Sequence, residues 1–458
     1  MSPLQTPASL SETAALIARR DVSPVEVTRA CLERIAAEND ALRAFITVCP
    51  EAALAEAARA EQEIGRGRYR GALHGIPVSV KDLVDVAGVP TTSASNLPPR
   101  RPAHDAPVVA NLRRAGAIVI GKTNLHEFAF GTTGDETAFG AIRHPLDRTR
   151  SAGGSSSGAA VALLAGMCLG SIGTDTGGSI RIPAAACGVV GLKPTFGELS
   201  TESVVPLSAT LDHVGPLAWT VADTGAMFRA MRDGEAGDAP APRPAQLWLG
   251  IPAPYFLEKL DAGVRASFGA ARIALEQAGH SVADLHIAHA ARIADVYLHI
   301  VLPEASWYHA PWLARHHGLY SPGVRLRLEM GRYILAEDYL RAMHARDLLR
   351  RAVDRALEGL DALMLPTLPI PAPPLGAVSV DVGESREPVR AIMLRLTQLF
   401  DITGHPAIAL PCGRGADGLP HSLQLVGHRG GTDRLLEIAA IVEGQIPGGV
   451  GSVGGVAG

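Results

Sequence analysis

The sequence predicts an α/β fold in which a central mixed β-sheet is covered by helices on both sides. Between residues 73 and 220, short apolar segments alternate with helical stretches, which is typical of a mixed or parallel sheet packed between helices. Further apolar segments at 247–251, 406–411 and 422–426 predict strands late in the chain. With 458 residues, 47% of them hydrophobic, the chain can bury a large core.

The N-terminal part predicts three helices between residues 8 and 66, packed on the outside of the sheet. The second helix has the clearest start. Ser23 can cap it, Pro24 suits the first helical position, and Glu26 completes a capping box.

The elements that follow are read from hydrophobic periodicity and turn residues. They are strands at 75–80, 117–121, 169–174 and 189–192, helices at 106–115, 158–165, 262–279 and about 324–355, and a closing helix at 432–443. A segment rich in Pro, Ala and Gly at 233–246 is expected to be an exposed connector within one fold.

Three regions are predicted along the chain. Residues 1–70 form N-terminal helices that pack on the core. Residues 71–445 form the core domain, which carries a helical cap at about 285–355. Residues 446–458 are rich in Gly and Val and are expected to form a disordered tail.

The predicted cap is rich in aromatic and histidine side chains, although only 4% of the chain is aromatic. Residues 285–345 include Trp307, Tyr308, His309 and Trp312. Two interpretations stay open: these side chains form the buried face of a helical cap, or some of them line a pocket for an apolar or aromatic substrate.

Charge and cysteine content exclude several classes of protein. A net charge of −4 argues against nucleic-acid binding. The five cysteines are widely spaced and form no Cys-x-x-Cys pair, so neither a disulfide framework nor a zinc site is indicated. The N-terminus lacks a signal-peptide pattern, and no apolar stretch approaches the roughly 18 residues of a membrane span. We therefore expect a cytoplasmic protein.

Two glycine-flanked serine segments and one lysine point to the chemistry. The serines lie in Gly-Gly-Ser-Ser-Ser-Gly at 153–158 and in Gly-Thr-Asp-Thr-Gly-Gly-Ser-Ile-Arg-Ile-Pro at 173–183. Glycine suits a backbone that must approach another group closely. Lys81 ends an apolar, strand-like run and is one of only four lysines, against 38 arginines. Lysine can lose its proton when desolvated, whereas arginine cannot.

The other three lysines have simpler interpretations. Lys122 and Lys193 are expected to hydrogen-bond backbone in tight turns, and Lys259 lies among charged neighbours typical of a surface. Phosphate binding by the glycine-rich loops is a competing function. The Gly-Lys-Thr at 121–123 lacks the upstream glycine of a P-loop, so this function is not favoured.

Taken together, the ordered blocks resemble the amidase signature family of serine hydrolases. The resemblance rests on Gly-Ile-Pro-Val-Ser-Val-Lys-Asp at 75–82, the two serine segments, Gly-Leu-Lys-Pro-Thr at 191–195 and Gly-Leu-Pro-His-Ser-Leu-Gln-Leu-Val-Gly at 418–427. It extends over roughly residues 9 to 445. It implies the amidase signature fold for the core domain and hydrolysis of carbon–nitrogen bonds.

The resemblance implies a Ser/Ser/Lys triad. Ser179 is then the nucleophile, Ser155 is a bridging serine that follows a cis peptide bond, and Lys81 is the base. The residue types suit these roles, because a serine hydroxyl needs a base and no histidine lies in a motif next to either serine. A buried, neutral lysine can take the proton through a second hydroxyl.

The resemblance assigns supporting roles to further residues. Asp175 and Arg181 brace the loop before the nucleophile, and Ser156 supports the lysine. Consecutive backbone N–H groups with little side-chain bulk suit an oxyanion hole. The expected donors are those of Thr176, Gly177 and Gly178. The expected substrate-binding backbone is that of Ala129, Phe130 and Gly131.

Departures from the common family pattern bear on the substrate. Glu136 and His144 stand where many members have Asn, Leu146 where many have Trp, and Asp401 opens a segment that usually reads Asn-Leu-Thr-Gly. Ile182 is apolar where members selective for carboxylates have Arg or Gln. Small acidic amides such as malonamate or glutamine are therefore less expected than apolar or aryl amides.

The predicted function is an amidase that forms an acyl-enzyme, with carbamates (a urethanase activity) and aryl esters as further substrates. The alternative is an A-type subunit of glutamyl/aspartyl-tRNA amidotransferase, which supplies ammonia from glutamine to a partner. No cofactor or metal is expected. The expected partner is the small-molecule amide, carbamate or ester, with no nucleic acid and no membrane, and a homodimer is left open.

Overall fold

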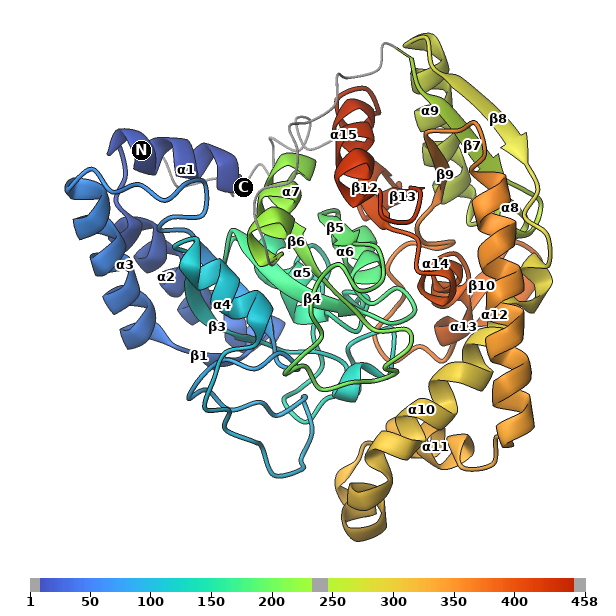
Figure 1. The fold of residues 1–458 in the computed structure, drawn as a ribbon, viewed down its shortest axis with the longest axis horizontal. Helices are drawn as coiled ribbons and strands as arrows, with labels where there is room; N and C mark the ends of the chain where they lie inside the picture. Colours follow the sequence, from blue (N-terminus) through green and yellow to red (C-terminus); the bar gives the residue numbers. More distant parts are fainter. Residues whose placement is uncertain (1–8, 233–245, 449–458) are drawn as a thin grey trace.

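An eleven-stranded mixed sheet runs through the molecule (Figure 1). The computed structural model describes residues 9–232 and 246–448. The strands of the large sheet are β1 (Phe45–Val48), β2 (Pro77–Lys81), β3 (Ile118–Thr123), β4 (Gly170–Asp175), β5 (Val190–Lys193), β6 (His213–Ala218), β7 (Trp248–Pro252), β8 (Ser281–Leu285), β9 (Ala362–Pro366), β12 (Ala407–Arg414) and β13 (Pro420–Val426). Their order in space is β1-β3-β2-β4-β6-β5-β12-β13-β9-β7-β8. The pairs β2·β3, β2·β4, β7·β8 and β7·β9 are parallel and the other pairs are antiparallel, which confirms the predicted mixed sheet.

Helices surround the sheet. They are α1 (Leu10–Arg19), α2 (Pro24–Leu42), α3 (Pro50–Gly65), α4 (Pro107–Arg114), α5 (Ser157–Leu164), α6 (Arg181–Cys187), α7 (Val221–Met231), α8 (Tyr255–Glu258), α9 (Ala262–Gln277), α10 (Ile293–His316), α11 (Pro322–Gly331), α12 (Ala336–Ala356), α13 (Val389–Leu394), α14 (Gln398–Thr403) and α15 (Thr432–Glu443). Short 3₁₀ turns occur at Glu127–Ala129, Ala290–Arg292 and His317–Leu319, and β10 (Ser379–Val382) pairs with β11 (Ser385–Pro388) in a separate hairpin.

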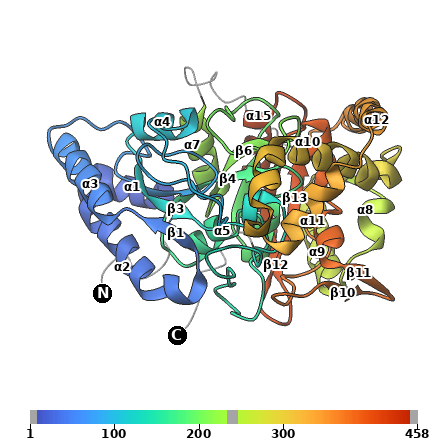
Figure 2. The same cartoon turned by 90° about the horizontal axis from the view of Figure 1, so that it is seen from below.

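Alternating side chains divide the core into two faces. In β3, Val119 joins one apolar cluster, whereas Ile118 and Ile120 join another, as expected for a strand buried on both sides. Helices α1, α4, α7, α9 and α15 contribute to the first cluster, and Figure 2 shows α4, α7 and α15 along the same side of the sheet. The opposite face is covered by α2, α3, α5 and α6 over the N-terminal strands and by α10 to α14 over the C-terminal ones.

The N-terminal helices form where the sequence predicts them. The Ser23 side chain accepts from Glu26 N, and the Glu26 side chain accepts from Ser23 N, so the predicted capping box is confirmed. Ser9 and Glu12 form a second capping box at α1. The strand β1, which lies between α2 and α3 and pairs with β3, is missing from the sequence prediction.

The predicted cap region contains α10, α11 and α12, and α10 packs against both of the others (Figure 1). The single helix predicted at about 324–355 is wrong, because residues 332–335 separate α11 from α12. Most of the predicted connector at 233–246 and of the tail at 446–458 lies outside the described residues. Within the described ranges, no helix has both the length and the apolar character that crossing a membrane requires.

Candidate active site

The predicted site residues meet at one edge of the sheet. Strands β2 and β4 are parallel neighbours, and they end at Lys81 and Asp175, so the two carboxyl ends bring these residues to the same edge. The loop after β4 carries Ser179 into α6, and Ser155 and Ser156 directly precede α5. Functional groups in sheets of this type commonly lie beyond the carboxyl ends of parallel strands.

Lys81 is fully buried and is surrounded by hydroxyl groups. Its Nζ lies 2.8 Å from Ser155 Oγ, 2.8 Å from Ser156 Oγ and 2.7 Å from Thr174 Oγ1. The sequence prediction missed Thr174. The available signal was its place in β4, one residue before Asp175, at the end of a strand that is adjacent to β2.

Burial lowers the pKa of Lys81 to about 7, against the opposing influence of Asp175 and Asp212. Asp82, the next residue along the chain, faces another lysine: Lys122 Nζ lies 2.8 Å from Asp82 Oδ1, and both side chains are fully buried. Lys122, which lies in strand β3, therefore pairs with the carboxylate of Asp82. Its predicted role in a tight turn is wrong.

The two serines of the expected triad differ in environment. The Gly154–Ser155 peptide bond is cis, as the resemblance implies. Ser155 is fully buried, whereas Ser179 remains 5% exposed. Ser156 N donates to the Ser179 carbonyl at 3.1 Å, which ties the two serine segments together. Within the described residues, Ser179 Oγ has no hydrogen-bond partner, so the relay contact from Ser179 to Ser155 is not formed in this structure.

The loop from 176 to 179 presents backbone N–H groups. Gly178 N donates to Asp175 Oδ1 at 2.6 Å, so this N–H group, one of the three expected oxyanion donors, is already engaged. In the described structure, the N–H groups of Thr176 and Gly177 have no assigned acceptor, and neither has that of Ser179, which the sequence prediction omitted.

A buried ion network braces this loop. Arg181 is fully buried and lies 3.1 Å from Asp175 and 2.6 Å from Asp401. Burial alone would raise the pKa of Asp175, but Arg181 holds it below the ordinary value. Burial and the nearby Asp175 raise the pKa of Asp401 well above its ordinary value. Lys193 donates to two backbone carbonyls, as predicted, but it does so from the end of β5 and not from a tight turn.

The segment 126–136 forms a further wall of the site. Ala129 lines a cavity of about 70 Å³ together with Thr174 and Thr176. Phe128 and Ala129 have positive φ values of 51° and 59°, which non-glycine residues rarely adopt outside functional or strained segments. Phe130 is buried beneath two arginine side chains, so its ring faces these arginines.

Replacing Gly131 with alanine is expected to destabilise this wall. A Cβ at Gly131 would lie 2.0 Å from Nε2 of His126, whose ring is held by Glu136 and by Gly134 N. We expect the free energy of unfolding to fall by roughly 1 to 3 kcal/mol, measured by urea denaturation.

The matched control for that substitution is Gly269→Ala. Gly269 lies inside α9, and an added Cβ there meets nothing within 4 Å. This variant should gain up to about 1 kcal/mol, since alanine is the better helix former. Equal stability changes in the two variants would contradict the predicted clash with His126.

A larger cavity lies beside the small one. It has a volume of about 510 Å³ and shares Pro206, Leu207 and Ala209 with the small cavity. The predicted cap contributes Trp307 and Tyr308 to its lining. The further lining residues are Thr210, Pro303, Glu304, Ile334, Leu335, Ala336 and Tyr339.

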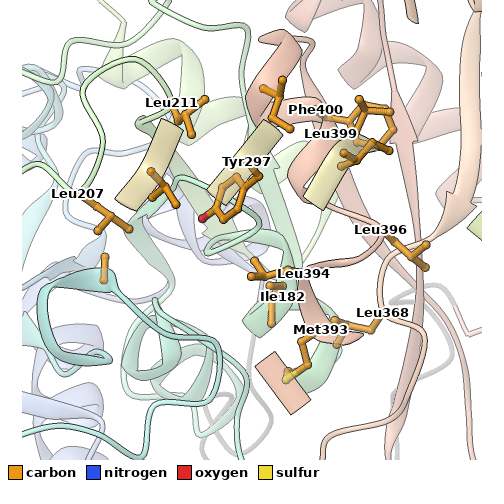
Figure 3. Close-up of a cluster of buried hydrophobic side chains, with 14 of the residues drawn as sticks. Ile182, Leu207, Leu211, Tyr297, Leu368, Met393, Leu394, Leu396, Leu399 and Phe400 are labelled. Atoms are coloured by element: carbon orange, nitrogen blue, oxygen red, sulfur yellow. The ribbon is translucent and has the colours of Figure 1, made fainter. Parts of the chain in front are cut away.

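Another part of the aromatic cluster is buried packing. His309 is 1% exposed, lies 4.4 Å from the Phe128 ring and bonds through Nδ1 to the Tyr320 hydroxyl. The buried-face interpretation therefore holds for His309 and Tyr320, whereas Trp307 and Tyr308 line the larger cavity. Leu207 and Tyr297 belong to a cluster of buried apolar side chains that also contains Ile182 (Figure 3).

Two departures from the family pattern have structural roles. Glu136 accepts from Gly323 N and lies 2.8 Å from Arg327 in α11, so it ties the site wall to the cap. The hydrogen bond from His126 contributes most to lowering the pKa of Glu136 to about 2. His144 is buried, and its Nε2 donates to the Ala186 carbonyl at 2.9 Å.

Comparison with known proteins identifies the class. The family model described as Amidase matches residues 26–436. An amidase from Pseudomonas putida is 38% identical, with 90% of each chain covered. The A-type subunit of the glutamyl-tRNA(Gln) amidotransferase from Chloroflexus aggregans is 35% identical over 90% of this chain and 91% of that protein. A crystal structure of an amidase superposes with a TM-score of 0.90 at 37% identity, covering 96% of this chain and 100% of the other.

Fold and sequence thus define a hydrolase that acts on carbon–nitrogen bonds other than peptide bonds. The chain belongs to the amidase signature family, as the sequence blocks indicated. In the described part of the chain, no group of three or more His, Cys, Asp or Glu side chains is arranged to hold a metal ion.

Proposed function

We propose that the protein is an amidase in which Ser179 attacks the carboxamide, Ser155 relays the proton and Lys81 is the base. The observation that carries this proposal is the 2.8 Å contact between the buried Lys81 Nζ and Ser155 Oγ. Because burial lowers the pKa of Lys81 to about 7, a large fraction of the side chain is neutral near neutral pH.

The hydrogen bonds around Lys81 Nζ support proton transfer from Ser155 to the lysine. A neutral lysine has two N–H donors and one lone pair. Ser156 Oγ donates to the Thr174 carbonyl at 3.2 Å, so its oxygen can only accept from Lys81. The lone pair of neutral Lys81 is then left for Ser155 or Thr174, and Ser155 can pass its proton to Nζ while it takes the proton of Ser179.

The reaction then has two halves. Ser179 Oγ bonds to the carbonyl carbon as its proton passes through Ser155 to Lys81. The tetrahedral intermediate collapses, and the C–N bond breaks as the same proton returns through Ser155 to the leaving nitrogen. Water then attacks the acyl-enzyme while its proton passes through Ser155 to Lys81. The ester bond breaks, the proton returns to Ser179, and the acid is released. The missing Ser179–Ser155 contact is expected to form with substrate, since hydrogen bonds of unliganded sites often tighten only in the complex.

Backbone N–H groups would hold the developing oxyanion. The free donors at Thr176, Gly177 and Ser179 support this role, and Asp175 would act by fixing the Gly178 N–H and hence the loop. Preorganised donors of this kind contribute on the order of 3 kcal/mol each to transition-state binding.

Apolar or aryl amides are the proposed substrates. The 510 Å³ cavity next to the site, lined by Leu207, Trp307 and Tyr308, supports an apolar or aromatic group beside the reacting carbonyl. Because the acyl-enzyme does not require a nitrogen leaving group, aryl carbamates and aryl esters are proposed as further substrates.

A substrate panel tests this proposal. The purified protein alone should hydrolyse an anilide or an aryl carbamate with a higher kcat/KM than glutamine. Initial rates on aliphatic amides, anilides, carbamates and glutamine measure the ranking. Glutamine as the best substrate of the isolated chain would contradict the proposed specificity.

A second candidate is the A-type amidotransferase subunit, which the 35% identity to such subunits favours. In that role, ammonia from glutamine passes to a partner chain. Glutaminase activity that arises only when a companion protein is added would favour this candidate, whereas anilide hydrolysis by the isolated chain favours the first.

A further inference from the structure

Arg390 is an unpartnered cation close to the candidate active site. It lies on α13, and its Nε is enclosed with no hydrogen-bond partner. Within the described residues, its guanidinium forms no hydrogen bond or ion pair. The side chain is half-buried, and a partly desolvated charge without a counter-charge is unfavourable, so a partner supplied by a ligand is the natural complement.

The position of α13 places Arg390 near the loop of the proposed oxyanion hole. A methyl group at Gly177 would lie 3.0 Å from Leu394 Cδ2 and 2.6 Å from the Tyr297 hydroxyl, so both side chains pack on this loop. Arg390 precedes Leu394 by four residues, which puts the two on the same face of α13. Figure 3 shows Leu394 and Tyr297 close to Ile182 in this cluster.

The charges around Phe130 do not balance. The guanidinium carbons of Arg327 and Arg390 lie 5.3 and 5.7 Å from the centre of the Phe130 ring. Glu136 is the carboxylate beside them, and it is already bound to Arg327, to His126 and to Gly323 N. One positive charge, that of Arg390, is left over. Burial lowers the pKa of Arg390 to about 10, so it still carries its charge at neutral pH.

We propose that Arg390 binds a carboxylate of the substrate, so that the preferred amides are acidic as well as partly apolar. This inference rests on the proposed amidase function and narrows its substrate class. Guanidinium groups bind carboxylates through paired N–H donors. The apolar Ile182 argued against small acidic amides, but a cation on α13 can serve a longer substrate whose carboxylate extends past Tyr297.

Matched anilide pairs test the proposal. In the first pair, glutaric acid mono-4-nitroanilide is compared with pentanoic acid 4-nitroanilide, so the carboxylate is on the acyl side. In the second, N-pentanoyl-4-aminobenzoate is compared with pentananilide, so it is on the leaving group. At least one acidic compound should have a roughly 10- to 100-fold advantage in kcat/KM over its neutral partner.

The variants assign that advantage to one side chain. Arg390→Met keeps an unbranched apolar stem and should reduce the advantage to within about threefold, with the neutral compounds little affected. Arg390→Lys should retain part of it. Arg332→Met, which removes an exposed arginine that has no ion pair in the described structure, should leave the advantage unchanged.

Binding measurements on variants that lack the nucleophile test the proposal without turnover. Calorimetric titration of all four compounds into Ser179→Ala and into Ser179→Ala/Arg390→Met should reproduce the same advantage and its loss. An advantage that survives in Arg390→Met, or equal or absent binding of the acidic and neutral compounds, overturns the carboxylate site. Neutral anilides hydrolysed equally by Ser179→Ala and the unaltered protein would instead overturn the proposed mechanism.

Discussion

Replacing Ser179 with alanine is expected to lower kcat on an amide by about 10⁴-fold or more, because the attacking atom is gone and only binding and oxyanion stabilisation remain. The fold should persist. Ser179 Oγ makes no hydrogen bond in the described structure, so its removal leaves no buried group unpaired. Initial rates measure the loss, and thermal unfolding should show a stability change within about 0.5 kcal/mol.

A fluorophosphonate separates the roles of the two serines. It should label Ser179, which is 5% exposed, and not Ser155, which is fully enclosed. Ser155→Ala should lose several orders of magnitude in turnover but keep slow labelling of Ser179, since the attacking hydroxyl remains. A mass-spectrometric adduct on Ser155 or on a cysteine of the unaltered protein would show that the assignment of the nucleophile is wrong.

Local signals predicted most of the fold. The capping box at Ser23 and Glu26 defines the start of α2, because all its contacts lie within one turn. β1 was missed since Phe45–Val48 is only four residues long and three of its side chains are half-buried, so no clear alternation marks it. The break between α11 and α12 was missed because apolar spacing continues through Ile334 and Leu335, although the backbone leaves the helix there.

The catalytic blocks were predictable, and the pairings among charges were less so. Adjacent residues of an extended chain point to opposite sides, so Lys81, which ends β2, and Asp82, which follows it, could have been expected to have different partners. That Asp82 binds Lys122 depends on the pairing of β2 with β3, which periodicity alone does not define. The engagement of Gly178 N by Asp175 depends on the loop conformation.

Contacts between residues far apart in the sequence could not be predicted from local sequence patterns. Glu136 was noticed as a departure from the family, but its bonds to Gly323 and Arg327 join residues that are 187 and 191 positions apart. Arg390 carries no motif at all. Its importance comes only from what the fold places around it, namely Phe130 and Tyr297, and from the partner that it lacks.

Replacing Lys81 with arginine is expected to inactivate the enzyme almost as fully as replacing it with alanine. Arginine keeps the positive charge but cannot give up its proton near neutral pH, so it cannot serve as the base. It must also fit a larger planar group among Ser155, Ser156 and Thr174, which lie within 2.8 Å of Nζ. We expect a loss in kcat of about 10³-fold or more, measured against the unaltered protein at its optimal pH.

The pH dependence follows from the same side chain. Burial lowers the pKa of Lys81 from 10.5 to about 7, and the base works in its neutral form. Activity should therefore rise with pH through about 7 and then level off. Asp212 could give a similar pH profile, because burial raises its pKa to about 7. If activity required ionised Asp212, the rate would also rise with pH near 7. The rising limb should persist in Asp212→Asn if Lys81 is the base.

Chemical rescue distinguishes the base from every other group that titrates near neutral pH, including the buried Lys193. In Lys81→Ala, the space of the lysine side chain is empty beside Ser155, so a small primary amine such as methylamine can take the proton in its place. The rescued rate should increase with the concentration of free amine, and guanidinium at equal concentration should not restore it. Substantial activity in Lys81→Arg, with the rising limb unchanged, would mean that the base lies elsewhere and that the proposed triad fails.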